Sequence, residues 1–276
     1  MDFQEIEELK KRWAREQVEL QQKAIFEDHN LCFHTSPPRG SIEPDKAAPD
    51  YDDPTVHNED PKTFTVSGLR YVGGLDISFI AQEDESAETM DFPGHNASNP
   101  NVPDAYAVIT VLEYPSLSVG AMLPTNLVHS ITEPIRLTAP YIPSFLSYRE
   151  TPAYLELISK LRENLQKAGK EHEFPQVILV DGNGQLHERE AGVATAVGVQ
   201  AGVPTVGVAK TYHPPTLQHH EVHESHWRLS QKGIKQKSRE VLKRPGDYLG
   251  VLNARRDRYV GVVSASHFFS SSQFGD

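Results

Sequence analysis

The stretch Phe174–Gly192, FPQVILVDGNGQLHEREAG, constrains the fold of this chain most. It starts with an apolar run at 177–180, which is β-branched and leucine-rich without a polar side, as is typical of a central strand buried on both faces. The run ends at Asp181 and continues into the turn Gly182–Gly184. Open α/β sheets bind ligands at the carboxyl ends of such strands, and glycines allow close approach. Asp181 is therefore a candidate site residue, although an Asp that only opens a turn would leave the same pattern.

Bulk composition narrows the class of protein. A chain of 276 residues holds one large domain or two small ones. Its single cysteine, Cys32, excludes an intramolecular disulfide and fits a reducing compartment. The first residues are charged and lack the apolar core of a signal peptide, and no apolar run of about 18 residues is present that would span a membrane. We therefore expect an intracellular monomer in the cytoplasm or the nucleus, including the nucleolus, with no membrane contact.

The formal net charge of −11 argues against a nucleic-acid partner only until the charges are located along the chain. Residues 1–62 carry a net charge of −7, and residues 82–104 carry six acidic residues and no basic one. Between Lys210 and Arg244, by contrast, eight Lys or Arg residues accompany three Glu. The acidity is confined to an N-terminal arm and an insertion, so the basic stretch permits contact with phosphates.

Patterning along the chain predicts four regions. Residues 3–28 are expected to form an amphipathic helix with one apolar face, made by Ile6, Leu9, Trp13, Leu20 and Ala24. Six prolines that alternate with acidic and small residues between His34 and Lys62 are typical of a disordered linker. We expect a helix that packs on the core at 1–30, the acidic linker at 31–66, the main domain at 67–254 with an insertion at 82–104, and a divergent end at 255–276.

The expected order of elements in the main domain is three strands, helix, strand, helix, strand. Arg70–Ile80 alternates as a strand and places Asp76 in mid-strand, where Asp is disfavoured; an edge strand with one wet face is the alternative. The other expected strands are Ala105–Glu113, Leu117–His129, 176–180 and Pro204–Ala209, followed by a hairpin of Tyr248–Asn253 and Tyr259–Ser264. The expected helices are a short one ending at Tyr148, one that restarts at Thr151-Pro152, and one over about 190–201.

This order is that of the ribonuclease-H-like fold, an α/β architecture in which helices flank a mixed five-stranded sheet. Its first and fourth strands are neighbours, so Asp76 and Asp181 would face each other, and Glu150 at a helix junction can approach the same point. Three carboxylates in one place repel each other unless a hard cation neutralises them, and all-oxygen sites select Mg²⁺ or Mn²⁺. Such an ion polarises a phosphate and lowers the pKa of a bound water. The spacing favours a metal-dependent phosphodiesterase.

The chain resembles the endonuclease V family, nucleases that act at deaminated purines, in four segments: VGGLDISF (72–79), PYIPSFLSYRE (140–150), VDGNGQLHERE with GVA (180–194) and PTVGVAK (204–210). The segments follow the family's order, and the resemblance extends to about Asn253. It implies hydrolysis of the second phosphodiester on the 3′ side of inosine, leaving a 3′-hydroxyl and a 5′-phosphate. The implied roles are DNA repair or the processing of inosine-containing RNA, and the VDGNG variant and the linker favour single-stranded RNA over DNA.

The resemblance also implies roles for individual residues. Asp76, Glu150 and Asp181 match the family's Mg²⁺-binding carboxylates, with Mn²⁺ expected to substitute. Lys210 would lie beside the scissile phosphate as an electrophilic aid. A wedge that fills the gap left by a flipped base is implied for Tyr141, together with its neighbours Ile142 and Pro143. The remaining implied contacts are the hypoxanthine pocket residues Gly182, Gly184, Gly192 and Val193, and His187, which resembles a residue behind the carboxylates.

Each assignment has an alternative. Tyr141 can simply pack between two prolines, Lys210 can be a solvated lysine at a strand end, and the glycines can serve turns and packing. Histidines at i, i+4 spacing suggest zinc, but without a Cys or a distant ligand pair a polar, partly cationic loop is favoured; the histidines concerned are His213, His219, His220, His223 and His226.

The C-terminal part departs from the family's pattern. The family has a histidine in a segment similar to VSxGH, then a helix and a basic tail that contacts nucleic acid, whereas this chain has VSASH and then FFSSSQFGD. His267 is therefore the expected fourth catalytic residue, and the end is expected to be a short form or a mis-annotated end. Two alternatives stay open: another ribonuclease-H-like nuclease without the wedge, and a catalytically impaired protein that binds inosine or RNA.

Overall fold

The computed structural model divides into two compact units, Met1–Phe33 with Gly68–Lys210, and His34–Ser67 with Thr211–Asp276. It describes residues 2–27, 30–35, 66–80, 102–114, 127–210, 231–242, 248–252 and 259–264. Most of the expected linker and the expected insertion lie outside these described residues, and the four regional boundaries stay predictions.

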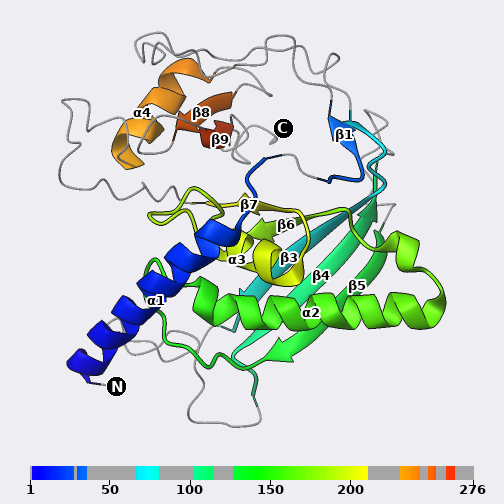
Figure 1. The fold of residues 1–276 in the computed structure, drawn as a ribbon, viewed down its shortest axis with the longest axis horizontal. Helices are drawn as coiled ribbons and strands as arrows, with labels where there is room; N and C mark the ends of the chain where they lie inside the picture. The colour runs from blue at the N-terminus through cyan, green and yellow to red at the C-terminus, as the bar shows by residue number, and fades with distance from the viewer. Residues whose placement is uncertain are drawn as a thin grey trace, which may run out of the picture. The chain divides into compact units, whose positions relative to one another are not determined.

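A five-stranded mixed sheet forms the centre of the first unit, with strand order β5-β4-β3-β6-β7 (Figure 1). Strands β3, β4 and β5 pair antiparallel, whereas β6 pairs parallel with both β3 and β7. The strands are β3 Tyr71–Phe79, β4 Ala105–Glu113, β5 Leu127–Ile135, β6 Val177–Asp181 and β7 Thr205–Val208. The predicted neighbours β3 and β6 therefore do lie next to each other.

Helices α2 (Ser147–Ala168) and α3 (Val193–Ala201) cover one face of this sheet (Figure 1). Alternate residues of β3 and β4 point into this layer, because successive side chains of a strand point to opposite faces. Leucines and isoleucines of α2 meet them from the other side. The buried core includes Leu75, Ile109, Leu157, Leu161, Ile178 and Val180.

Helix α2 corrects the expected break at Thr151-Pro152. The structure has one continuous helix from Ser147, with Pro152 inside it. Pro152 lies beyond the first four residues, whose N–H groups have no helical partner, so the helix loses one backbone hydrogen bond there. The buried face formed by Tyr154, Leu157 and Ile158 holds the helix on the sheet across the proline.

Strand β5 corrects a second expectation. The expected strand Leu117–His129 overlaps the observed Leu127–Ile135 only at its end, and residues 115–126 lie outside the described part of the chain. The observed strand contains Glu133 and Pro134, which weaken its apolar alternation. It lies at the edge of the sheet, where a proline without an N–H is tolerated.

Helix α1 (Phe3–Lys23) begins at a capping box, in which Asp2 Oδ1 accepts from Glu5 N at 2.8 Å and Asp2 N donates to Glu5 Oε2 at 2.7 Å. Trp13 packs in a small apolar cluster with Ile142 and Phe145. Three residues of the expected apolar face, Ile6, Leu9 and Trp13, therefore belong to this cluster. No helix within the described ranges is long and apolar enough to cross a membrane.

Within its described residues, the second unit contains two small antiparallel pairs and a helix. Strands β1 (His34–Thr35) and β2 (Val66–Ser67) pair with each other, as do β8 (Tyr248–Leu252) and β9 (Tyr259–Ser264), which confirms the expected hairpin. Helix α4 (Gln231–Val241) was not predicted, because its sequence is rich in Gln and Lys and poor in apolar residues. The histidine group at 213–226 and His267 lie outside the described residues.

Candidate active site

Two carboxylates lie on adjacent strands where β3 and β6 run parallel. The register pairs Leu75 with Val180, so the next residues, Asp76 and Asp181, are neighbours. Leu75 and Val180 point into the core, and both aspartates therefore belong to the opposite face. The buried strand and the turn after it place Asp181 where open sheets present ligand-binding groups.

Glu150, in the first turn of α2, senses both aspartates. Burial, followed by the charges of Asp181 and Asp76, raises the pKa of Glu150 to about 7, while Arg149 opposes the shift. The same three carboxylates also raise the pKa of Tyr154, one turn along α2, in addition to the larger effect of its burial. The three predicted carboxylates therefore share one electrostatic environment, although they come from three elements.

The donor chemistry of this group suits a hard divalent cation, because every candidate ligand atom is a carboxylate oxygen. The side chains are nevertheless engaged elsewhere: Asp76 Oδ1 accepts from Ile77 N at 2.9 Å, and Asp181 Oδ2 pairs with Lys210 Nζ at 3.2 Å. Across the described part of the chain, no group of three or more His, Cys, Asp or Glu residues is arranged to hold a metal ion. The carboxylates thus suit a hard cation in kind, whereas the described side chains do not form a joint ligand set.

Lys210 follows β7 at the same edge of the sheet. Its side chain is 85% exposed, and that of Asp181 is 37% exposed. An ion pair so open to water contributes little to stability. The ammonium group therefore remains accessible to a ligand phosphate beside Asp181.

Backbone hydrogen bonds join the glycine-rich loop after β6 to the start of α3. Ala194 N donates to Asn183 O at 3.1 Å, and Gly192 N donates to Gly184 O at 3.0 Å. A Cβ at Gly192 would lie 2.1 Å from Asn183 O, so only glycine fits there. Gly182, at φ +143°, also needs glycine's conformational freedom. Packing therefore accounts for part of the role of these glycines, as the alternative interpretation expected.

The space around the loop's glycines differs from one position to the next. Val193 is buried in the main core and packs at the site where a Cβ of Gly182 would lie. Gly184, by contrast, has room, since no heavy atom would lie closer than 3.8 Å to an added Cβ. Gly184 is thus the open position of the loop.

The loop before α2 presents one aromatic side chain outward. Tyr141 is 49% exposed, and Pro143 is exposed as well. Ile142 points the other way, into the cluster with Trp13 and Phe145. The loop is therefore anchored by Ile142 while Tyr141 is available at the surface.

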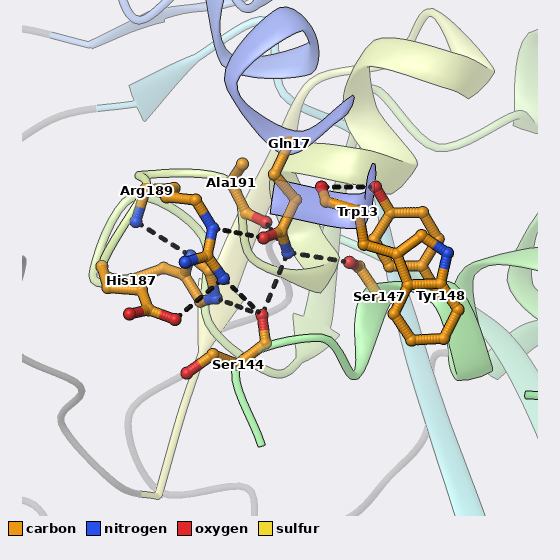
Figure 2. Close-up of polar contacts among 9 residues, drawn as sticks. Trp13, Gln17, Ser144, Ser147, Tyr148, His187, Arg189 and Ala191 are labelled. Carbon is orange, nitrogen blue, oxygen red and sulfur yellow. Dashed lines mark hydrogen bonds and ion pairs between the residues drawn. The ribbon is translucent and has the colours of Figure 1, made fainter. Parts of the chain in front are cut away.

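His187 lies in a buried polar network rather than in a hydrogen bond to a carboxylate of the group above. Its Nε2 is 2.9 Å from Ser144 O, and its Nδ1 accepts from Arg189 N at 3.2 Å, as Figure 2 shows. This pair of contacts fits a neutral ring protonated at Nε2. His187 thus links the glycine-rich loop to the loop that carries Tyr141.

Comparison with known proteins identifies the family. The family model described as Endonuclease V matches residues 54–267, more than half of the chain. The chain belongs to the endonuclease V family. Human endonuclease V is 36% identical over 193 residues, which cover 70% of this chain and 57% of the human protein, and mouse endonuclease V is 38% identical over 145 residues, covering 52% and 33%. The match thus spans little more than half of the human relative.

Solved endonuclease V structures agree with the fold. The catalytic domain of human endonuclease V, solved as a variant with substituted cysteines, is 28% identical with a TM-score of 0.54, covering 93% of this chain and 75% of that chain. Endonuclease V of Ciona intestinalis has a TM-score of 0.57 at 21% identity, covering 93% and 77%, and so bears on the fold alone. The family resemblance and the mixed five-stranded α/β fold are both confirmed.

Sequence reasoning missed several residues at this candidate site. Arg149 is buried, donates to Ala139 O at 3.4 Å and lies over the Phe79 ring, 5.7 Å from its centroid. Gln17 and Arg189 bridge α1 to the two loops described above. A usable signal existed for Gln17: it is a polar residue four positions after Trp13, inside the apolar stripe of α1.

Proposed function

We propose that this protein is a metal-dependent endonuclease that cleaves inosine-containing strands at the second phosphodiester on the 3′ side of inosine. The products would carry a 3′-hydroxyl and a 5′-phosphate. The observation that carries the proposal is the electrostatic environment that Glu150, on α2, shares with Asp76 and Asp181, which lie on the adjacent strands β3 and β6. Family membership supports it. So does the Ciona intestinalis relative, solved in complex with a 24mer DNA that contains an inosine followed by a ribo-adenosine.

Asp76, Glu150 and Asp181 would hold Mg²⁺, with Mn²⁺ as a substitute, because carboxylate oxygens suit hard cations. A bound ion would supply polarisation of the phosphate and a lowered pKa of the attacking water. Neutralisation of the mutual repulsion would also let Glu150 ionise. Lys210 would exchange its exposed pair with Asp181 for the scissile phosphate, and His267 would complete the catalytic set.

Base recognition in this proposal belongs to the two loops. Tyr141 is exposed and would fill the gap left by the flipped inosine, with Pro143 beside it and Ile142 as the buried anchor. The backbone edges of Gly182, Gly184 and Gly192 would contact the base where side chains are absent, with Val193 behind them. His187 would hold this pocket in place from the buried side.

The direct test uses four oligonucleotides of one sequence: RNA and DNA, each with or without a single inosine. Incubation with Mg²⁺ should cut the inosine strands between the 3′ neighbour of inosine and the nucleotide that follows it. We expect single-stranded RNA to be cut faster than DNA. Equal cutting of the unmodified strands would contradict the inosine specificity. Tyr141→Ala should remove the inosine preference, whereas another ribonuclease-H-like nuclease would keep its substrate pattern.

A second function, inosine binding without cleavage, is favoured by one observation. Asp76 and Asp181 are engaged with Ile77 N and Lys210, and no joint ligand set is formed among the described side chains. This alternative predicts retained binding to inosine oligonucleotides and no product with either Mg²⁺ or Mn²⁺. Any product that depends on Asp181 would exclude it.

A further inference from the structure

Gln17 is a polar residue in the middle of the apolar stripe of α1, and it is 1% exposed. A buried amide is costly unless its hydrogen-bonding groups are satisfied. Gln17 Nε2 lies 3.1 Å from Ser144 O, 3.3 Å from Ala191 O and 3.4 Å from Ser147 Oγ, and Oε1 accepts from Arg189 Nε at 2.6 Å (Figure 2). Both ends of the amide are therefore in use.

These partners come from two loops that are far apart in the sequence. Ser144 and Ser147 lie between Tyr141 and Glu150, at the entry to α2. Arg189 and Ala191 belong to the loop that runs from Asp181 to α3. Gln17 thus joins the loop that carries the exposed tyrosine to the glycine-rich loop, from a third element that contributes no carboxylate to the site.

The carbonyl of Ser144 is the centre of this arrangement. Gln17 Nε2, His187 Nε2 at 2.9 Å and Arg189 Nη2 at 3.3 Å all point at it. Ser144 itself has φ +69°, and Glu190 in the other loop has φ +52°. A residue with a side chain adopts this left-handed conformation only at a cost in free energy, so surrounding contacts must hold it there.

We propose that Gln17 is a positioning residue for base recognition: by holding Ser144 O and Arg189 together, it fixes the Tyr141 loop against the Gly182–Gly192 loop in the arrangement that admits inosine. This role rests on the proposed function. Gln17 touches no reacting atom in it. Its effect is on the distance between the two walls of the base pocket, and hence on discrimination between bases.

The test compares Gln17→Met and Gln17→Glu with matched changes at Gln22, which is exposed on the same helix. Methionine keeps the length and apolar stem but makes none of the hydrogen bonds, whereas glutamate still accepts from Arg189 and cannot donate to the carbonyls. The measured quantity is the ratio of kcat/KM for an inosine strand to that for the same strand with guanosine. This ratio does not depend on the folded fraction of the enzyme.

We expect the ratio to fall at least about tenfold for both Gln17 variants, with a larger change in KM than in kcat, and to stay within about twofold for Gln22→Met and Gln22→Glu. A loss of activity with an unchanged ratio would overturn the proposal, because it would make Gln17 a structural residue only. Gln17→Glu keeps this test valid if Gln17→Met does not fold.

Amide hydrogen exchange separates the positioning role from the proposed function, because it requires no substrate. Exchange in the Gln17 variants should accelerate more at 142–148 and 184–192 than in β3 and β4, where it follows global unfolding. Unchanged exchange in both loops would overturn the proposal. If exchange accelerates but the wild-type protein shows no inosine preference, the loop coupling stands while base recognition, and the proposed function with it, fails.

Discussion

Two polar groups of similar size flank the start of α2, and they are built in opposite ways. In the first, Glu150, Asp76 and Asp181 bring like charges together, and the pKa of Glu150 rises to about 7. In the second, Gln17, Arg189 and their neighbours match donors to acceptors in a buried network. The first group stores unfavourable electrostatic energy, and the second stabilises the loops that carry it. Repelling charges of this kind are typical of a group that binds a ligand, whereas matched donors and acceptors are typical of a group that makes the structure rigid.

The largest effect is expected when a charge is removed from the first group, Asp76, Glu150 and Asp181, which we call the repelling group. Asp181→Asn should lower cleavage of an inosine strand by at least about a thousandfold, because a ligand and part of the attraction for a cation are lost. Single-turnover cleavage at saturating Mg²⁺ measures this. Glu133→Gln, a change to a surface carboxylate paired with Lys160, should leave the rate within about twofold. Retained cleavage by Asp181→Asn would place the metal centre elsewhere.

Removing the amide of Gln17 should cost stability in addition to the loss of base discrimination described above. Gln17→Met leaves buried donors and acceptors without their partner, so we expect the free energy of unfolding to fall by about 2–3 kcal/mol. Urea denaturation followed by circular dichroism gives this value. Gln22→Met, on the exposed side of α1, should change it by less than about 0.5 kcal/mol. Equal effects of the two substitutions would show that the network adds nothing to stability.

Removing a charge from the repelling group should raise the free energy of unfolding, whereas removing the Gln17 amide should lower it. Folding raises the pKa of Glu150 from 4.5 to about 7, so the folded state binds a proton more tightly than the unfolded chain. Without divalent cations, this residue's contribution to stability should therefore decrease as pH rises from about 4.5 to about 7. Glu150→Gln should stabilise the protein by about 3 kcal/mol at about pH 8 and by nothing at about pH 4. A pH-independent difference between wild type and variant would contradict this origin.

The smallest effect on the free energy of unfolding is expected at the pair Lys210–Asp181, which is exposed to water. Lys210→Met should change the free energy of unfolding by less than about 0.5 kcal/mol, because water screens the pair. Cleavage by the same variant should nevertheless drop if the ammonium contacts the phosphate. Thermal unfolding and kcat measured on one preparation separate the two contributions. A large loss of stability would mean that the ion pair is structural.

The repelling group was predictable from sequence because its residues break local rules. Asp76 stands in mid-strand, and Asp181 ends an apolar run before glycines, so each is conspicuous where it occurs. The order of strands then brings the two together, as the parallel register of β3 and β6 does in the structure. The strands β3, β4, β6 and β7 were likewise predicted to within one or two residues, since apolar alternation or a buried run marks them.

The satisfied network was not predictable in the same way. Gln17 interrupts the apolar stripe of α1, which marks this residue but not its partners. Ser144 and Arg189 are ordinary surface residues by type, and only tertiary contacts bring the three together. The continuity of α2 through Pro152 and the extent of the edge strand β5 were missed for a related reason. In each case packing against the rest of the sheet overrides a local preference that the sequence displays more clearly.

Gln17 and Ala191 are 174 positions apart in the chain, and this spacing bears on how the protein is made. Helix α1 leaves the ribosome long before its partner loop exists, by roughly 10–35 s at synthesis rates of about 5–20 residues per second. For most of that interval, until Ile142 and Phe145 have been made, Trp13 lacks its apolar partners. The hydrogen bond by which α1 holds the second loop can therefore form only after Ala191 has been made.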